Sequence, residues 1–484
     1  MKIAILADLH LSDNFTTVKG QVLDWAVTEV RSLKCDLACC IGDMTAQGSR
    51  EQTAEVLRRL QSMGVPFCST PGNAELRIFA NGETAQAFDI AAPQNMYIVL
   101  LNSAAGTPTA DELSKLDQIA DNAGFLLATH IPPRRWSDEA QAKVQSAMAR
   151  RAVTAVIAGH SHHDEADILR GLDPDKASGG VPMLTVMSRT QDGSWQRTDH
   201  TINGVDPAEW SNQQRLTFAD ELGISTMWQE LEALEFAAVN HIKNVDLRMT
   251  LNANKELPEA IEKWRKSGGK ILSLHLPDLK AADDDGKLAQ YARMACKLGC
   301  DRVTLHVPKV TAAGFEEHKE KLLKKFADDL DCLLEKNVII GIENLHTKVG
   351  EDTFETRNFG CTIDECYQWI MLLRKRFDTE NIGFHLDIGH ARNNAPISGK
   401  ENLSDWYLKM GKFINGWHIH QVTQSAGKFH NHQPMTGFYD KLISLAGLFM
   451  AFRAGQLSQA PMFLESRQWA DNIKAYQNLI KKLR

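Results

Sequence analysis

A set of polar side chains follows short apolar runs in the N-terminal part of the chain. Five blocks carry these side chains, and each block ends a run that is typical of a buried strand. They are two carboxylates, one amide and four imidazoles: Asp8, His10, Asp43, Asn73, His130, His160 and His162. Oxygen and imidazole donors without thiolate suit Mn²⁺, Fe or Zn²⁺. The pattern therefore predicts a site for metals of this kind.

Seven ligands are enough for two ions that share one carboxylate. Two metals about 3.5–4 Å apart can hold a bridging hydroxide and neutralise a phosphoryl group during in-line attack. Any one of the histidines alone could be an ordinary core or surface residue. Five blocks in this order, three of them with a neighbouring glycine, are hard to explain by packing. We expect two divalent metals, Mn²⁺, Fe or Zn²⁺, in this domain.

The order D-x-H, GD, GN, H and GHxH resembles that of the calcineurin-like metallophosphoesterases over the first 200 residues. The stretches "ATHIPP" and "AGHSH" are similar to the cyclic-nucleotide phosphodiesterase branch of that family. The resemblance implies that Asp43 bridges two metals. It further implies that one metal is held by Asp8, His10 and His162, and the other by Asn73, His130 and His160.

One position departs from this family pattern. The family has Gly-Asn-His before an acidic residue, whereas this chain reads "GNAE", with Ala74 at the position of the catalytic histidine. That imidazole would steady the transition state or protonate the leaving oxygen, a role worth roughly 10²–10⁴-fold in rate. Either Ala74 was engineered to silence turnover, or the domain is a naturally weakened hydrolase. Because every expected ligand is intact, we favour engineering; a native sequence with alanine at position 74 would overturn this.

A second set of metal-type side chains occurs in the C-terminal half, again after apolar runs. It consists of His275, His306, Glu343, Asp387, His390, His418, His430, His432 and Glu465. These residues come from six successive predicted strands or the loops that follow them, and in a (β/α)8 barrel such strand ends meet at one mouth. Nine buried polar side chains without partners would be costly, which argues against a packing role.

The order of this second set resembles the xylose-isomerase-like barrels, and among them the endonuclease IV family of apurinic-site nucleases, over most of residues 219–484. The resemblance implies three zinc sites: His275, His306 and Glu343; Glu343, Asp387, His418 and Glu465; and His390, His430 and His432. The family has aspartate at the position of His430, so the third site departs from the pattern. We expect two to three divalent metals, Zn²⁺ or Mn²⁺, and interpret His385 and His420 as residues that orient ligands.

The surrounding sequence predicts an α/β protein of two domains. In residues 1–200, a layered α/β sandwich is expected, with strands at 2–8, 37–43, 65–70, 96–103, 124–130, 155–160 and 181–188. The polar stretch 201–218 is expected to be a linker. In residues 219–484, strands at 222–226, 245–250, 270–276, 302–307, 338–344, 382–388, 416–422 and 461–466 alternate with amphipathic helices, as in a (β/α)8 TIM barrel.

Composition narrows the class of protein. No apolar run of the 484 residues approaches the roughly 20 residues of a membrane span, and "MKIAILADLH" is too short for a signal segment. We therefore expect a cytoplasmic protein without a membrane partner, whose nine cysteines are reduced thiols. A net charge of −7 mildly favours small anionic substrates, because a broad grip on nucleic acid needs a basic face. The sequence does not indicate an oligomeric state.

The leading hypothesis is a dual metal-dependent hydrolase that cleaves phosphodiester bonds in nucleic acid or nucleotides. In a first alternative, the N-terminal domain releases a sugar from a phosphodiester and the barrel isomerises or epimerises it. Isomerase activity that is lost in Glu343→Gln would favour that alternative. In a second, the N-terminal domain senses a nucleotide and gates the barrel, which nucleotide binding without turnover by Ala74→His would favour.

Overall fold

The computed structural model describes residues 1–77, 87–93, 96–119, 124–151, 154–252, 254–281, 286–348, 350–398, 402–425, 428–440 and 442–484. Contacts divide the chain into two compact units. The first unit is Met1–Asp206 with Tyr439–Met450, and the second is Pro207–Phe438 with Ala451–Arg484. Residues 201–218, expected to be a linker, contain a 3-10 turn at Pro207–Glu209 and the first part of helix α6 (Asn212–Glu221).

The first unit is built on two sheets. The larger sheet has the order β3 (Phe67–Thr70), β2 (Leu37–Ile41), β1 (Lys2–Leu6), β7 (Met183–Arg189) and β8 (Trp195–Thr201). The smaller sheet is parallel and consists of β4 (Ile98–Leu101), β5 (Phe125–Thr129) and β6 (Thr154–Ala158). The helices are α1 (Val18–Ser32), α2 (Arg50–Gln61), α4 (Ala110–Ser114) and α5 (Asp138–Ala149).

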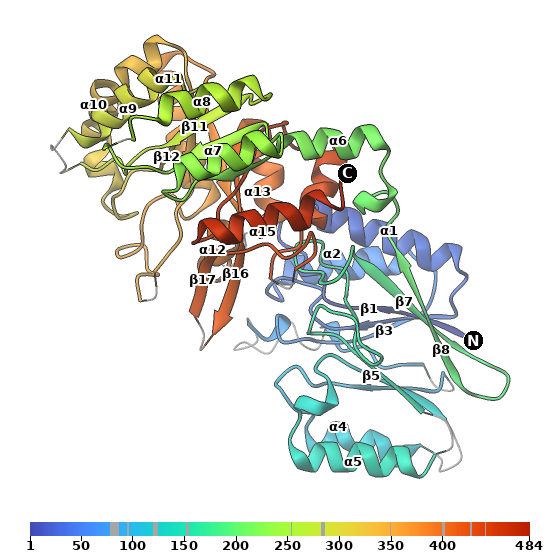
Figure 1. The fold of residues 1–484 in the computed structure, drawn as a ribbon. Helices are drawn as coiled ribbons and strands as arrows, with labels where there is room; N and C mark the ends of the chain where they lie inside the picture. The colour runs from blue at the N-terminus through green and yellow to red at the C-terminus, as the bar shows by residue number, and fades with distance from the viewer. Residues whose placement is uncertain are drawn as a thin grey trace. The chain divides into compact units, whose positions relative to one another are not determined.

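The apolar core of this unit lies between the two sheets. Alternate residues of β1, Ile3 and Ile5, pack in one buried cluster with Leu126 and Ala128 of β5. The opposite face of the smaller sheet packs in a second cluster with α5, which contributes Val144. Figure 1 shows α4 and α5 on that outer face. The layers therefore follow from the period-two alternation of the strands, and the layered sandwich expected from the sequence is present.

The second unit contains a closed barrel of parallel strands, in the order β10-β11-β12-β13-β14-β15-β18-β9. The strands are β9 (Leu222–Ser225), β10 (Asn244–Leu247), β11 (Ile271–His275), β12 (Arg302–His306), β13 (Ile339–Glu343), β14 (Ile382–Asp387), β15 (Ile414–Ile419) and β18 (Met462–Leu464). The eight strands overlap those predicted, and the (β/α)8 fold is confirmed. A two-stranded hairpin of β16 (Gln421–Ser425) and β17 (Lys428–Gln433) follows β15 (Figure 1).

Helices surround the barrel. They are α7 (Glu230–Val239), α8 (Leu257–Lys266), α9 (Lys287–Leu298), α10 (Phe315–Glu335), α11 (Ile363–Phe377), α12 (Ile388–Ser398), α13 (Leu403–Met410) and α15 (Trp469–Ile480). A further helix, α14 (Ala446–Arg453), begins within the first unit. In α10, Leu322, Phe326 and Leu330 recur at helical spacing and are buried. Local signals set the ends: the Thr362 side chain caps α11, and Gly299 ends α9 in the left-handed conformation.

Inside the barrel, below the strand ends, lies a buried arginine side chain. Arg302 is almost fully buried, and its Nη2 lies 3.0 Å from Nδ1 of His385. A Cβ at Gly341 or Gly416 would lie 2.4 or 2.3 Å from this guanidinium, so both glycines make room for it. His385 therefore contacts the barrel core as well as the neighbouring ring of His418, at 4.1 Å between ring centroids.

Two expectations concern the whole chain. Among the described residues, no helix is both long and apolar enough to cross a membrane. The nine cysteines all lie in described parts of the chain, and none of them forms a disulfide.

Candidate metal centres

The seven polar residues of the first unit lie where its strands end. Asp8 and His10 follow β1, Asp43 follows β2, Asn73 follows β3, His130 follows β5, and His160 and His162 follow β6. Five of them have left-handed backbone: Asp8, His10, Asp43, His160 and His162, with φ of 55°, 51°, 51°, 71° and 54°. Such a conformation costs roughly 1–3 kcal/mol for a residue other than glycine, and this kind of strain clusters at functional sites.

These residues form two groups of potential ligand atoms. Asp8, His10 and His162 form one group, and Asp43, His130 and His160 form the other; within each, the ligand atoms lie within 4.8 Å of one another. Nε2 of His10 is 3.2 Å from Nε2 of His162. Asn73 joins the second group, since its Oδ1 lies 2.8 Å from Nδ1 of His160 and 3.0 Å from Nε2 of His130.

Asp43 lies between the two groups. Its Oδ2 is 3.6 Å from Nε2 of His10 and 3.5 Å from Nε2 of His130. One carboxylate oxygen therefore faces a histidine of each group, as a bridging ligand would.

Two glycines allow the carboxylates to approach the neighbouring loops. A Cβ at Gly72 would lie 2.3 Å from Oδ1 of Asp43, and one at Gly159 would lie 2.6 Å from Oδ2 of Asp8. No side chain fits at either position without displacing a potential ligand. The glycines of the "GN" and "GH" pairs are thus explained by close packing.

Buried charge dominates the electrostatics of this site. Burial raises the pKa of Asp8 to about 8. Burial alone would lower the pKa of His130, but the Asp43 carboxylate outweighs it and raises that pKa to about 9. Protons therefore compensate the buried carboxylates in the metal-free protein, and divalent cations would take over this role. The donor set and its charge balance fit two divalent metals.

Glu75 supports this candidate site, and sequence reasoning gave it no role. It is fully buried, and its Oε2 accepts from the N–H groups of Asp43 at 2.8 Å and Gly72 at 2.7 Å. Its Oε1 accepts from the N–H of Thr45 at 2.9 Å. Glu75 thus joins the loops after β2 and β3 and holds Asp43 in place. The sequence signal that could have identified Glu75 is its position two residues after Asn73, a predicted ligand.

The barrel places its metal-type residues at the carboxyl ends of its strands. His275, His306 and Glu343 are the last residues of β11, β12 and β13, and they form one group of potential ligands. Oε2 of Glu343 lies 3.1 Å from Nε2 of His275 and 3.4 Å from Nε2 of His306.

Glu343 also reaches the next part of the site. Its Oε1 is 3.0 Å from Nδ1 of His418, which in turn is 3.2 Å from Oε2 of Glu465. Burial alone would lower the pKa of His418, but Glu465 and Glu343 outweigh it and raise this pKa well above its usual value. Glu343 therefore has one oxygen toward each of two neighbouring groups.

The remaining candidate ligands are grouped differently from the second and third expected sets. Asp387, His420, His432 and Glu465 form one group, and His390, His420 and His432 another. His420, interpreted from the sequence as an orienting residue, lies within both, with its Nε2 3.0 Å from Asp387. His430, expected as a ligand, instead has its Nε2 2.8 Å from Oγ of Ser425 in the β16–β17 hairpin.

Two histidines of this last group support binding of a cation. Nδ1 of His390 donates to the Asn344 carbonyl at 3.0 Å, and Nδ1 of His432 to the Glu465 carbonyl at 3.3 Å. Burial lowers the pKa of both rings, that of His432 to about 3, so both are neutral. Their Nε2 atoms, 3.4 Å apart, therefore present lone pairs to each other, an arrangement that a metal would satisfy.

Two further residues belong to the barrel site. Asp278 lies 2.8 Å from Nδ1 of His306 and fixes the orientation of that ring. Arg248, just after β10, forms an ion pair with the Glu465 carboxylate. Sequence reasoning gave neither residue a role, because Arg248 falls within the expected strand 245–250 and Asp278 is one of several charged residues in its loop.

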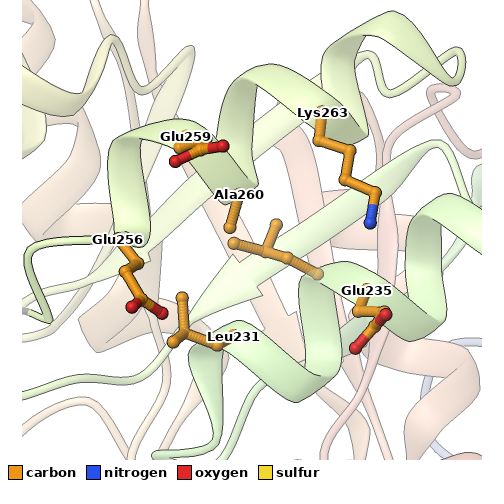
Figure 2. A pocket seen from close by; sticks show the side chains of 7 residues that line it. Leu231, Glu235, Glu256, Glu259, Ala260 and Lys263 are labelled. Carbon is orange, nitrogen blue, oxygen red and sulfur yellow. The ribbon is translucent and has the colours of Figure 1, made fainter.

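A separate hollow of about 360 Å³ lies between α7 and α8 (Figure 2). Its polar lining is Glu235, Glu256, Glu259 and Lys263. None of the metal-group residues lines it, so the candidate chemistry of this unit lies at the barrel mouth.

Two family models match the chain. Residues 234–483 match the model of the xylose isomerase-like TIM barrel, and residues 1–172 match that of the calcineurin-like phosphoesterase superfamily domain. The chain belongs to the xylose isomerase-like TIM barrel family. It carries a calcineurin-like phosphoesterase domain in front of that barrel, so the expected fusion is confirmed. Both families bind divalent metals. No curated protein matches the chain at a significant level.

Several solved structures are similar to one part of the chain. The TTHB071 protein from Thermus thermophilus, soaked with ZnCl2, is 18% identical, with 54% of this chain and 97% of that chain covered and a TM-score of 0.37. Endonuclease IV from the same organism is 16% identical, with 53% and 97% covered and a TM-score of 0.38. A dimetal phosphatase from Danio rerio is 15% identical, with 39% and 92% covered and a TM-score of 0.27.

Proposed function

We propose that the protein is a dual metal-dependent hydrolase of phosphodiester bonds in nucleic acid or nucleotides, with one metal centre in each unit. The observation that carries this proposal is the position of Asp43, whose Oδ2 faces His10 at 3.6 Å and His130 at 3.5 Å. A carboxylate shared between two histidine groups suits a pair of divalent ions. Such a pair supplies a hydroxide for in-line attack and neutralises the phosphoryl charge.

The residues of the first unit hold and orient this centre. Asp8, His10 and His162 would hold one ion, Asn73, His130 and His160 the other, and Asp43 would join them. Glu75 and the backbone N–H of Ala74 fix the Asp43 carboxylate. The position that would carry a general acid is occupied by a methyl group, so we expect slow turnover in this unit.

The barrel site is richer in histidine than sugar isomerisation requires. In this superfamily, isomerases and epimerases would need only the set at Glu343, Asp387, His418 and Glu465. Here His275 and His306 form a group with one oxygen of Glu343, and His390, His420 and His432 form another. Additional metals stabilise attacking and leaving oxygens in phosphodiester hydrolysis, which favours that reaction over isomerisation.

A nucleotide substrate is supported by two residues at the barrel mouth. The Arg248 guanidinium lies against Glu465, where it would meet a substrate phosphate. Trp228, three residues after β9, is 54% exposed, and its N–H donates to the Arg248 carbonyl at 2.9 Å. Met227 and Trp228 both have left-handed backbone, with φ of 45° and 63°. An indole held outward beside a phosphate contact suits stacking on a nucleobase.

The test compares the protein with Ala74→His on end-labelled DNA and RNA, single-stranded, duplex and abasic, and on cyclic nucleotides, with Mn²⁺ or Zn²⁺. Each form is also made with Asp43→Asn or Glu343→Gln. Cleavage by the first unit is expected to rise in Ala74→His and to disappear with Asp43→Asn. Cleavage by the barrel is expected to be lost with Glu343→Gln and to be retained with Asp43→Asn.

Matched controls are His163→Asn in the first unit and His318→Asn on α10, neither of which belongs to the metal groups identified above. If no form cleaves any phosphodiester, the proposal fails. Isomerisation of free sugars that is lost with Glu343→Gln would instead support the carbohydrate alternative. Nucleotide binding without turnover by Ala74→His would support a sensor.

A further inference from the structure

The first unit contains a segment that comes from far along the chain. Residues 439–450 follow β17 and include the start of α14, yet they cluster with Met1–Asp206. We infer that this segment is a positioning element of the N-terminal metal centre, because it holds the stretch 173–179 against the two histidines of the Asp8 group. The inference does not depend on which phosphodiester is cleaved.

Backbone hydrogen bonds join the segment to this stretch in both directions. Three of them are 2.9 Å long: Ser444 N–H to Asp175 O, Gly447 N–H to Pro174 O, and Gly179 N–H to Tyr439 O. Main-chain bonds of this kind fix position independently of side-chain identity. The segment therefore fastens the stretch at both of its ends.

The stretch in turn contacts both histidines. Ser178 N–H donates to the carbonyl of His162 at 2.8 Å. On the other side, Lys19 Nζ lies 2.8 Å from Oδ2 of Asp173 and 3.4 Å from the carbonyl of His10. Lys19 and Asp173 are fully buried, so this ion pair cannot rearrange through solvent. The stretch fastened by the segment thus contacts His162 directly and His10 through Lys19.

The segment is closely packed. Its apolar side chains are almost fully buried: Ile443, Leu445, Leu448 and Phe449. Gly447 fits so closely that a Cβ there would lie 2.1 Å from Oδ1 of Asp175. The Asp175 carboxylate is also 3.8 Å from Lys19 Nζ. A methyl group at position 447 would therefore displace the Asp175 carboxylate, which lies beside Lys19, and so disturb the Lys19–Asp173 ion pair next to His10.

The first experiment uses Gly447→Ala in the full chain and measures Mn²⁺ binding by calorimetry and by metal analysis. The ions of the first unit are identified as those lost in Asp43→Asn. We expect their affinity to fall by about 10–100-fold, the usual effect of a change behind the ligands, while barrel ions are retained. Gly314→Ala is the control, because its Cβ would meet only Thr311, whose Oγ1 lies 3.0 Å away. Unchanged affinity in Gly447→Ala would overturn the inference.

The second experiment needs no substitution in the segment and keeps the test valid if Gly447→Ala fails to fold. Hydrogen exchange of the unaltered protein is followed with and without Mn²⁺. The amides of Ser444 and Gly447 are expected to gain protection together with residues 173–179. This gain should disappear in Asp43→Asn and persist in Glu343→Gln. If 173–179 gain protection and the amides of 442–450 do not, the segment does not position the centre.

Discussion

The backbone N–H of Ala74 donates to Oδ1 of Asp43 at 2.6 Å. Position 74 therefore holds the carboxylate between the two metal groups through its main chain, whatever its side chain is. Substitutions of this one side chain can therefore test catalysis separately from assembly of the metal site.

Ala74→His is expected to leave metal affinity unchanged and to raise kcat of the first unit by about 10²–10⁴-fold, the contribution of a positioned general acid. The measurement is hydrolysis of bis-p-nitrophenyl phosphate with Mn²⁺, in a Glu343→Gln background. Ala74→Gln is the control, because it has a side chain of similar size that does not titrate. Equal rates for histidine and glutamine would contradict an acid role.

Glu75→Gln is expected to destabilise the first unit by about 1–3 kcal/mol, because one carboxylate oxygen becomes an NH2 that faces buried N–H donors. Chemical denaturation of the metal-free protein measures this change. Glu139→Gln on the exposed side of α5 is the matched substitution and should be neutral. A neutral Glu75→Gln would mean that the loops after β2 and β3 are held by other contacts.

His420→Asn and His430→Asn form a matched pair in the barrel. His420→Asn should lower the number of metal ions bound by the barrel, because His420 lies in two groups of potential ligands. His430→Asn should leave that number unchanged, because its ring contacts Ser425 instead. Metal analysis after gel filtration distinguishes the two. The reverse result would restore His430 as a ligand.

The metal-free protein is expected to lose stability as pH rises, between about pH 4 and 8 through Asp8 and between about pH 6.5 and 9 through His130. The pKa of Asp8 is raised to about 8 and that of His130 to about 9. A raised folded-state pKa gives stability that is present below the unfolded value and is lost as pH rises through the folded value. Both groups therefore act in the same direction. Tm of EDTA-treated protein measures this, and Asp8→Asn should weaken the trend; a Tm that rises with pH would contradict it.

Trp228→Ala is expected to raise KM for single-stranded nucleic acid by about 5–150-fold, the range that corresponds to loss of one base stack. The kcat for bis-p-nitrophenyl phosphate should not change, because that substrate has no base. Tyr367→Ala, a partly exposed aromatic residue on α11, is the control. An equal KM for Trp228→Ala and Tyr367→Ala would remove the stacking role.

Most residues of the two candidate metal centres could be predicted to lie together from the sequence, because both folds place polar side chains at strand ends. Glu343 and His275 could be assigned to one mouth from the amino-acid sequence, since parallel barrel strands all end on the same side. The strands could also be predicted from the sequence, because buried parallel strands are continuous apolar runs bounded by polar loops.

The positions of His420 and His430 could not be predicted from the sequence in the same way. His430 and His432 are two apart in β17, and regular alternation would place both on one face. However, the register of the hairpin shifts between Gln421 and Thr423, and His432 has a left-handed backbone with φ of 56°. The alternation is therefore broken, and only His432 joins His390. Irregularities of this kind have no signature in composition or periodicity.

The place of residues 439–450 in the first unit bears on how the protein folds as it is made. A ribosome synthesises residues 207–438 after Asp206 and before it reaches this segment. At about 5–20 residues per second, the 232 intervening residues take roughly 12–46 s. During that time the stretch 173–179 lacks the backbone hydrogen bonds that Tyr439, Ser444 and Gly447 later form with it. The support behind the Asp8 group is thus completed only after most of the barrel has been synthesised.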